Sequence, residues 1–166
     1  MSDCVYPCPC GYFGDSLKPC TCASAVVTKY QKRISGPLLD RIDIHIDVQR
    51  VDYEKLSGNR VSESSESIRA RVQAARNIQN KRFATGKAAD IVCNADMRIG
   101  EIRKFCQLQD EGQGLMRAAM SQLNLSARAY HRILKLSRTI ADLAGSEEIQ
   151  SAHLAEALQY RPKIMM

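Results

Sequence analysis

Between positions 65 and 83, apolar side chains recur every three or four residues, and this spacing constrains the fold more than any other feature of the sequence. Ile68, Val72, Ala75 and Ile78 would form one apolar stripe along a helix. The other faces of that helix are mostly polar and rich in arginine and lysine. A helix with one apolar stripe must bury it against other elements. The pattern therefore predicts a unit built from several packed helices.

More helices are expected along the rest of the chain. Residues 97–106 and 114–123 fit two shorter helices, which we expect the acidic stretch 110–112 to separate.

The last two helices are indicated by their ends. Ser126 is a good N-cap because its hydroxyl can accept a hydrogen bond from an unpaired amide, and Gly145 is a typical C-terminal stop. The run 146–148, serine followed by two glutamates, is expected to cap a final helix that Pro162 closes.

The amino-terminal part of the chain has a different pattern. Residues 25–32 fit a helix that ends in basic residues, and Gly36-Pro37 would break it. Residues 43–51 then alternate between apolar and polar side chains, which is typical of a half-buried strand. We therefore expect a short helix, a loop and a strand before the long helical region.

Composition excludes some classes of protein. No apolar run is long enough to span a membrane, and the first residues lack the basic start and apolar core of a secretory signal. The net charge of +6 is compatible with a nucleic-acid or nucleotide partner, but an ordinary soluble protein can carry it too. We expect no membrane partner and a cytoplasmic location.

Five of the seven cysteines lie within the first 22 residues. An odd number of cysteines without a signal peptide favours a reducing compartment, where clustered thiols bind metal or stay free. Cys8-x-Cys10 and Cys20-x-Cys22 could supply the four tetrahedral ligands that Zn²⁺ prefers. Reduced cysteines without metal in a loop are the alternative, and the spacing alone does not decide between them.

The chain contains no motif of a self-sufficient nucleotide-hydrolysing enzyme. A phosphate-binding loop of the type G-x-x-x-x-G-K-[ST] is needed to hold the phosphates through backbone amides and a lysine. Here Gly86-Lys87 is followed by Ala88, and the first glycine of the motif is a lysine at position 81. The chain alone is therefore expected to be inactive.

Several motifs occur in one order along the chain: YPCPCG at 6–11, PCTC at 19–22, ISGPLLDRID at 34–43, LSARAYHRIL at 125–134, RTIADL at 138–143 and LQYRP at 158–162. Together they resemble the competence-related branch of the magnesium-chelatase-like AAA+ ATPases, over almost the whole chain.

The resemblance implies a carboxyl-terminal portion of a homo-hexameric ring that binds ATP and Mg²⁺ between its subunits, with the phosphate-binding motifs preceding Met1. The implied fold is mainly α: residues 1–56 would hold the end of an α/β core with one or two strands and a cysteine-rich loop. Residues 57–66 would be a linker, and 67–166 a helical lid domain. The family is associated with DNA branch migration, which makes DNA a possible partner.

The resemblance assigns a catalytic role to Arg41, which stands where the family has an arginine acting on a neighbouring subunit's nucleotide. A guanidinium is always charged and forks onto phosphate oxygens, which suits γ-phosphoryl transfer. The alternative is a local ion pair with Asp40 or Asp43. Tyr6 stands where the family usually has an asparagine that orients the attacking water, so we assign no such residue.

Arg128 corresponds to the family's lid arginine, which contacts nucleotide. Arg132, Lys135 and Arg138 extend the same helix face, and we interpret those three as an ordinary solvated basic stripe.

Two functions of other classes remain open. The cysteine pairs, positive charge and basic helices permit a zinc-containing nucleic-acid-binding module without ATPase activity. The second alternative function is a helical interaction domain that binds no ligand.

Overall fold

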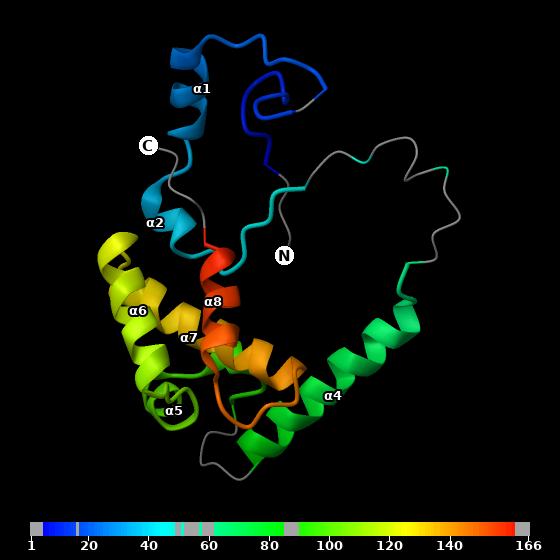
Figure 1. Cartoon of the computed structure of the whole chain (residues 1–166), viewed down its shortest axis with the longest axis vertical. Helices are drawn as coiled ribbons and strands as arrows, with labels where there is room; N and C mark the ends of the chain where they lie inside the picture. Colours follow the sequence, from blue (N-terminus) through cyan, green and yellow to red (C-terminus); the bar gives the residue numbers. More distant parts are fainter. Residues whose placement is uncertain are drawn as a thin grey trace. The chain divides into compact units, whose positions relative to one another are not determined.

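A computed structural model of the chain describes residues 5–15, 17–48, 51, 57, 62–84 and 90–161 (Figure 1). The chain divides into two compact units. The first comprises Met1–Arg41 and Ile46–Arg60, and the second comprises Ile42–His45 and Val61–Met166. The described part of the chain is mainly α-helical, as the sequence predicts. None of its helices is both long enough and apolar enough to cross a membrane.

The first unit contains two helices, α1 (Ser24–Gln31) and α2 (Gly36–Leu39). α1 confirms the helix predicted for residues 25–32, and it buries Val27. The side-chain amide of Gln31 donates a hydrogen bond of 3.1 Å to the carbonyl of Pro7, which ties the end of α1 to the cysteine-rich loop. α2 begins as an ordinary proline-led helix, with Pro37 in its first turn, because proline lacks the amide that the first turn would leave unpaired.

The strand predicted from the alternation in residues 43–51 is wrong for its described part, residues 43–48. Those residues belong to no strand, and the side chains of Ile46 and Val48 are 67% and 91% exposed. A strand is stabilised by a neighbour that pairs with its backbone. Within the described part of this segment, one backbone-to-backbone hydrogen bond forms, donated by the His45 amide to the Tyr160 carbonyl. Residues 49–50 lie outside the described part.

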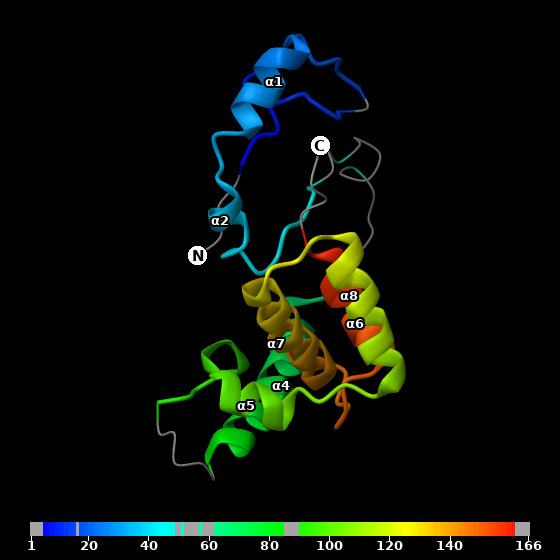
Figure 2. The same cartoon turned by 90° about the vertical axis from the view of Figure 1, so that its left-hand side faces the viewer.

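The second unit is a helical assembly in which α7 (Ala127–Leu143) is central. α7 contacts α8 (Ser151–Gln159), α4 (Ser65–Ala84), the 3-10 turn η1 (Asn94–Asp96) and α5 (Ile99–Phe105), and α6 (Asp110–Gln122) packs on α8 (Figure 2). Its core gathers apolar side chains from all of these helices, including Ile102, Met116, Ile133 and Leu154.

Two predicted helix ends are confirmed around α7. The Ser126 hydroxyl accepts a 3.2 Å hydrogen bond from the amide of Ala129, and Gly145 follows the helix with φ +68°. A residue with a Cβ adopts this left-handed conformation at a cost, so glycine suits the stop. Pro162, expected to close the final helix, lies outside the described residues.

Two other helix boundaries differ from the predictions. Residues 110–112 do not separate helices but form the first turn of α6. Gly112 is buried within this turn and does not break the helix, and a Cβ on it would meet Leu108 at an ordinary contact distance of 3.4 Å. The run 146–148 does not cap the final helix either, because α8 begins only at Ser151.

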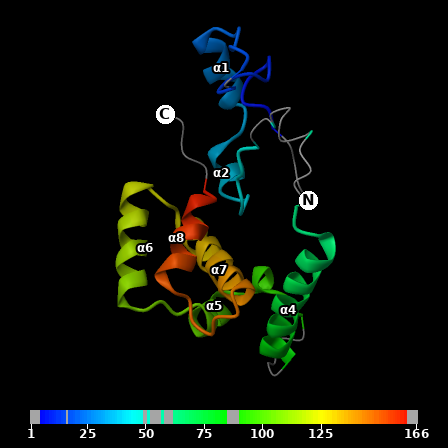
Figure 3. The same cartoon turned by 45° about the vertical axis from the view of Figure 1, so that its right-hand side comes forward.

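α4 buries only part of its apolar stripe. Its buried residues are Ala75, Gln79 and Phe83, all in the carboxyl-terminal half, whereas Ile68 and Val72 are 41% and 44% exposed. Figures 1 and 3 show the amino-terminal half of α4 projecting beyond the other helices of the second unit. The predicted stripe is therefore real, but the second unit covers about half of it.

Candidate functional site

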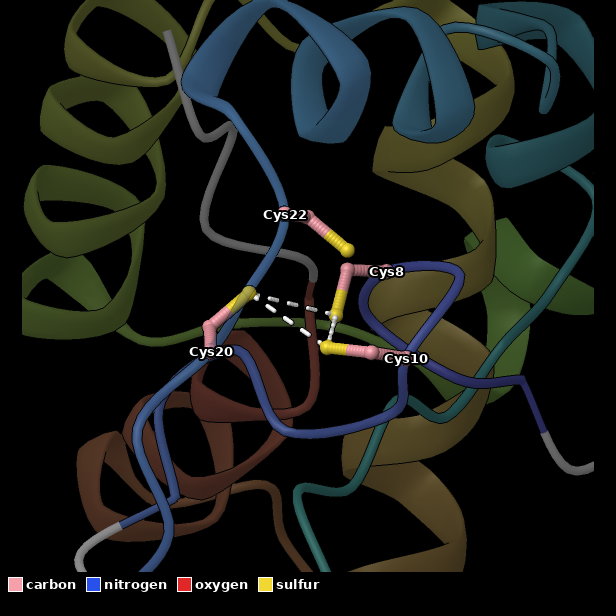
Figure 4. A group of neighbouring side chains, drawn as sticks. All are labelled: Cys8, Cys10, Cys20 and Cys22. Carbon is pink, nitrogen blue, oxygen red and sulfur yellow. Dashed lines mark hydrogen bonds between the residues drawn. The ribbon is translucent and has the colours of Figure 1, made fainter.

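Four cysteines of the first unit lie together. Cys8 and Cys10 belong to a tight turn, in which the Gly11 amide donates a 3.0 Å hydrogen bond to the Cys8 carbonyl and Gly11 has φ +81°. Cys20 and Cys22 belong to the extended segment that leads into α1. All four side chains point toward one another in Figure 4. The two predicted C-x-C pairs are thus brought into one cluster.

The spacing of the sulfurs fits a tetrahedral metal site. The Sγ atoms of Cys8, Cys10 and Cys20 are 3.3, 3.5 and 3.7 Å apart, and all four sulfurs lie within 4.8 Å of one another. A zinc–sulfur bond of about 2.3 Å places the corners of a tetrahedron about 3.8 Å apart. The four thiols are free rather than disulfide-bonded, and they could hold a zinc ion with small adjustments.

Backbone amides favour a negative charge on one sulfur. The amides of Tyr12 and Thr21 donate to the Cys10 sulfur and lower the pKa of its thiol to about 5. The Cys22 amide donates to Cys20, but burial and the hydrogen bonds that the Cys20 thiol donates to neighbouring sulfurs outweigh it and raise the pKa of Cys20 to about 12. Once one thiolate has formed, further negative charge in so small a volume is unfavourable without a cation. A bound cation would therefore stabilise the thiolates of this cluster, as in a metal site.

The other described cysteines lie apart from this cluster. Cys106 belongs to the core of the second unit, where burial raises the pKa of its thiol to about 11. The Cys93 thiol donates to Asp96 at 3.3 Å. Cys4 lies outside the described residues.

Arg41 is exposed and directly follows the turn that ends α2, where its amide donates a 2.9 Å hydrogen bond to the Leu38 carbonyl. Asp43, one of the two acids weighed as its local partner, forms an ion pair of 2.5 Å with Arg132.

Arg128 is the second residue of α7, and its side chain is exposed. It has no ion-pair partner among the residues that the structure describes. The amino terminus of a helix carries a partial positive charge, which favours anions near this turn.

The interpretation of Arg132, Lys135 and Arg138 as a solvated basic stripe is wrong for Arg138, whereas Arg132 and Lys135 are partly exposed. Arg132 pairs with Asp43, and Lys135 donates to the carbonyl of Ala95 at 2.7 Å. Arg138 is buried and bonds the Asp142 carboxylate at 3.0 Å.

Sequence analysis missed a buried polar network around Asp142. Arg82 binds both oxygens of this carboxylate at 2.5 and 2.8 Å, and Asn94 donates to it at 2.8 Å. Arg138 also donates to the carbonyls of Ser146 and Glu147. These two hydrogen bonds hold the run 146–148, which was expected to cap the final helix. The i, i+4 spacing of Arg138 and Asp142 was the one available signal.

The fold and the cysteine cluster define a two-part protein, a small cysteine-centred unit followed by a helical unit. Two sequence families match these parts in order: "Magnesium chelatase, subunit ChlI" matches residues 3–56, and "Magnesium chelatase, subunit ChlI C-terminal" matches residues 62–161. The chain belongs to this magnesium-chelatase family.

Curated relatives match most of the chain. It is 42% identical over 142 residues to "Competence protein ComM" of Haemophilus influenzae, which covers 84% of the chain and 26% of the relative. It is 37% identical to "Uncharacterized protein YifB" of Escherichia coli, with coverages of 93% and 29%. A Mycobacterium bovis relative, "Uncharacterized protein Mb2921c", is 30% identical, with coverages of 93% and 30%. The chain thus spans less than a third of the length of these relatives.

Proposed function

We propose that this chain acts as the carboxyl-terminal segment of a homo-hexameric AAA+ ATPase and supplies two arginines to nucleotide sites between subunits. Arg41 would contact the γ-phosphate of ATP–Mg²⁺ in a neighbouring subunit, and Arg128 would contact nucleotide from the lid. The order of the two family matches supports this proposal. The observation that carries it is the exposed Arg128 on the first turn of α7, without an ion-pair partner among the described residues.

The chemistry of both positions suits phosphate. A guanidinium presents a rigid fork of donors that matches phosphate oxygens and stabilises charge that develops during phosphoryl transfer. At Arg128 the side-chain charge adds to the positive end of α7. At Arg41 the side chain is exposed and directly follows the turn that ends a short helix. The chain alone has no phosphate-binding loop, so hydrolysis would need the rest of the ring.

The test is Arg41→Ala in the polypeptide that carries this segment together with a phosphate-binding loop. We expect ATP turnover to fall by about a thousandfold or more, with nucleotide affinity unchanged, because an arginine acting in trans stabilises the transition state. Arg117→Ala, on the exposed face of α6, is the matched control. Unchanged turnover in Arg41→Ala would remove this residue from its role.

A second proposal concerns the cysteine cluster, which we infer to be a structural zinc centre. The observation that carries it is the mutual approach of four sulfurs from two separate segments within 4.8 Å. Cys8, Cys10, Cys20 and Cys22 would be the ligands, and the ion would join the turn at Cys8 to the segment before α1. Such a thiolate centre suits the reducing cytoplasm, which is where the proposal places the chain.

Elemental analysis tests the zinc centre directly. We expect about one zinc per chain, lost in Cys8→Ser and retained in Cys93→Ser, whose sulfur lies outside the cluster. A chain purified in reducing buffer that takes up no zinc when the metal is added would overturn the assignment.

DNA remodelling by the whole assembly is the remaining part of the proposal, and a zinc-containing nucleic-acid-binding module is its alternative. The exposed side chains of Arg69 and Arg76 on α4 and the net charge of +6 support a nucleic-acid contact. Binding of duplex DNA by this chain alone, with a steep salt dependence that Arg69→Ala reduces, would favour the module. DNA binding only by the assembled ring would favour the ATPase.

A further inference from the structure

Ile42–His45, here called the docked segment, is held on the second unit by residues far away in the sequence. The Arg161 guanidinium donates a 3.1 Å hydrogen bond to the Ile42 carbonyl. Arg132 pairs with the Asp43 carboxylate at 2.5 Å. The His45 amide donates a 2.8 Å hydrogen bond to the Tyr160 carbonyl. In Figure 1 the chain after α2 passes the carboxyl-terminal end of α8, where two of these contacts form.

These contacts act along the whole docked segment rather than at one point. The Arg132–Asp43 pair alone would contribute little, since both side chains are partly exposed and surface ion pairs are weak. Arg161 is only 7% exposed, and its bond to Ile42 is therefore shielded from water. The backbone bond of His45 fixes the other end of the segment. Together the contacts restrain the backbone from residue 42 to residue 45.

The docked segment begins at the residue that directly follows Arg41. Consecutive Cα atoms are about 3.8 Å apart, so a fixed Ile42 limits how far the backbone of Arg41 can move. Arg132 lies one helical turn after Arg128 on α7. α7 thus carries Arg128, one of the two proposed nucleotide-contacting arginines. It also carries Arg132, which binds the docked segment that follows Arg41.

We propose that Arg161 and Arg132 are positioning residues for Arg41, because they hold the segment that directly follows it in the chain. This inference rests on the proposed function of Arg41. Catalysis is sensitive to position because a displacement of about 1 Å can cost about a hundredfold in rate. A docked segment that merely stabilised the helical unit would affect its folding but not the rate constant of a folded enzyme.

The first experiment measures docking in this chain by amide hydrogen exchange. In Arg161→Ala we expect the His45 amide to exchange about 2 to 10 times faster, because its segment loses a neighbouring hydrogen bond. The amide of Ile133 in the core should keep its protection, which shows that the unit remains folded. Arg117→Ala is the control and should change neither amide. If the exchange of His45 is the same in Arg161→Ala as in the unaltered chain, the docking part of the inference is wrong.

The second experiment measures turnover in the assembly that contains a phosphate-binding loop. We expect Arg161→Ala to lower kcat by about tenfold to a hundredfold without changing nucleotide affinity, and Arg161→Lys to recover part of the loss. If Arg41→Ala abolishes turnover while Arg161→Ala leaves it unchanged, the positioning role is refuted and the proposed function stands. If Arg41→Ala leaves turnover unchanged, the proposed function fails, and the inference fails with it.

A charge exchange keeps the inference testable should Arg161→Ala fail to fold. Asp43→Arg and Arg132→Asp should each lower kcat, by about fivefold at most, because both side chains are partly exposed. The double variant restores an ion pair of reversed polarity and should recover turnover. Single variants that lower kcat without recovery in the double variant would contradict a role through this pair.

Discussion

Asp142 is the residue on which the polar core of the helical unit depends. It is 2% exposed, and Arg82, Asn94 and Arg138 all donate to its carboxylate. We expect Asp142→Asn to lower the free energy of unfolding by about 3 to 5 kcal/mol, because it leaves two arginines without their shared anion. Urea denaturation followed by circular dichroism measures this change. Asp90→Asn removes an exposed pair with Arg98 and should cost less than about 1 kcal/mol. Equal losses in the two variants would contradict the prediction.

The same carboxylate predicts a pH dependence of stability. Burial alone would raise the pKa of Asp142, but hydrogen bonds from Arg82 and Asn94 outweigh it and lower the pKa. The folded state therefore binds this proton less readily than the unfolded state. The stabilisation is present above the unfolded pKa of about 3.9 and is lost as pH falls through the lowered folded value. When the pH is lowered below about 4, we expect the urea concentration at the unfolding midpoint to decrease. The decrease should be smaller in Asp142→Asn. A parallel fall in both proteins would exclude Asp142 as the cause.

These residues also mark how far sequence reasoning reaches at this scale. Arg138 and Asp142 are four residues apart on a helix, so their pairing could have been inferred. Arg82 and Asn94 lie 60 and 48 residues from Asp142 and meet it only because α4 and η1 pack on α7. The two C-x-C pairs could be recognised because each pair is local in the sequence. Whether the two pairs approach each other could not be decided from their spacing. Contacts between residues far apart in the sequence depend on tertiary packing, and the periodicity of a single helix does not predict that packing.

At the scale of the element, α7 is stabilised at its start by Ser126. Its hydroxyl accepts the hydrogen bond of the Ala129 amide at 3.2 Å. We expect Ser126→Ala to lower the free energy of unfolding by about 1 kcal/mol, because the amide loses its partner. Thermal unfolding followed by circular dichroism should show the lower midpoint. Ser121→Ala, on the exposed surface near the end of α6, is the control and should change stability by less than about 0.5 kcal/mol. Similar effects of the two changes would argue against the cap.

The helices were predictable as elements because an apolar stripe recurs with the helical period, as in α4, or because typical cap residues mark the ends, as in α7. Their boundaries were less predictable: the stretch 110–112, expected to separate two helices, forms the first turn of α6. The alternation in residues 43–48 failed for a different reason. Period two reports that a strand is possible, but a strand also needs a neighbouring strand, and among the described residues no such partner pairs with it. The docked segment instead uses its backbone to bind Tyr160 and Arg161, which directly follow α8.

At the scale of the whole molecule, the two units differ in how much apolar surface they bury. Among the described residues, the buried apolar side chains of the first unit are Cys8 and Val27. The second unit has a continuous core contributed by five helices and the loops between them. Small units with so few buried side chains usually need a metal or disulfides to stay folded. The proposed zinc centre would therefore supply stability that the first unit cannot draw from its core.

Removal of zinc should consequently affect the two units differently. We expect a chelator to abolish the amide protection of α1 in the first unit, since metal binding and folding are linked when the site is absent from the unfolded chain. The amides of Ile133 and Leu134 in α7 should keep their protection, because their core contains no zinc ligand. Hydrogen exchange with mass spectrometry, with and without chelator, measures both units in one sample, and Cys93→Ser serves as a control that should behave like the unaltered chain. Protection of α1 that survives chelation would mean that hydrogen bonds such as Gln31 to Pro7 suffice to hold the first unit. Loss of protection in α7 as well would mean that the zinc centre stabilises the helical unit too, and the division of stability argued here would be wrong.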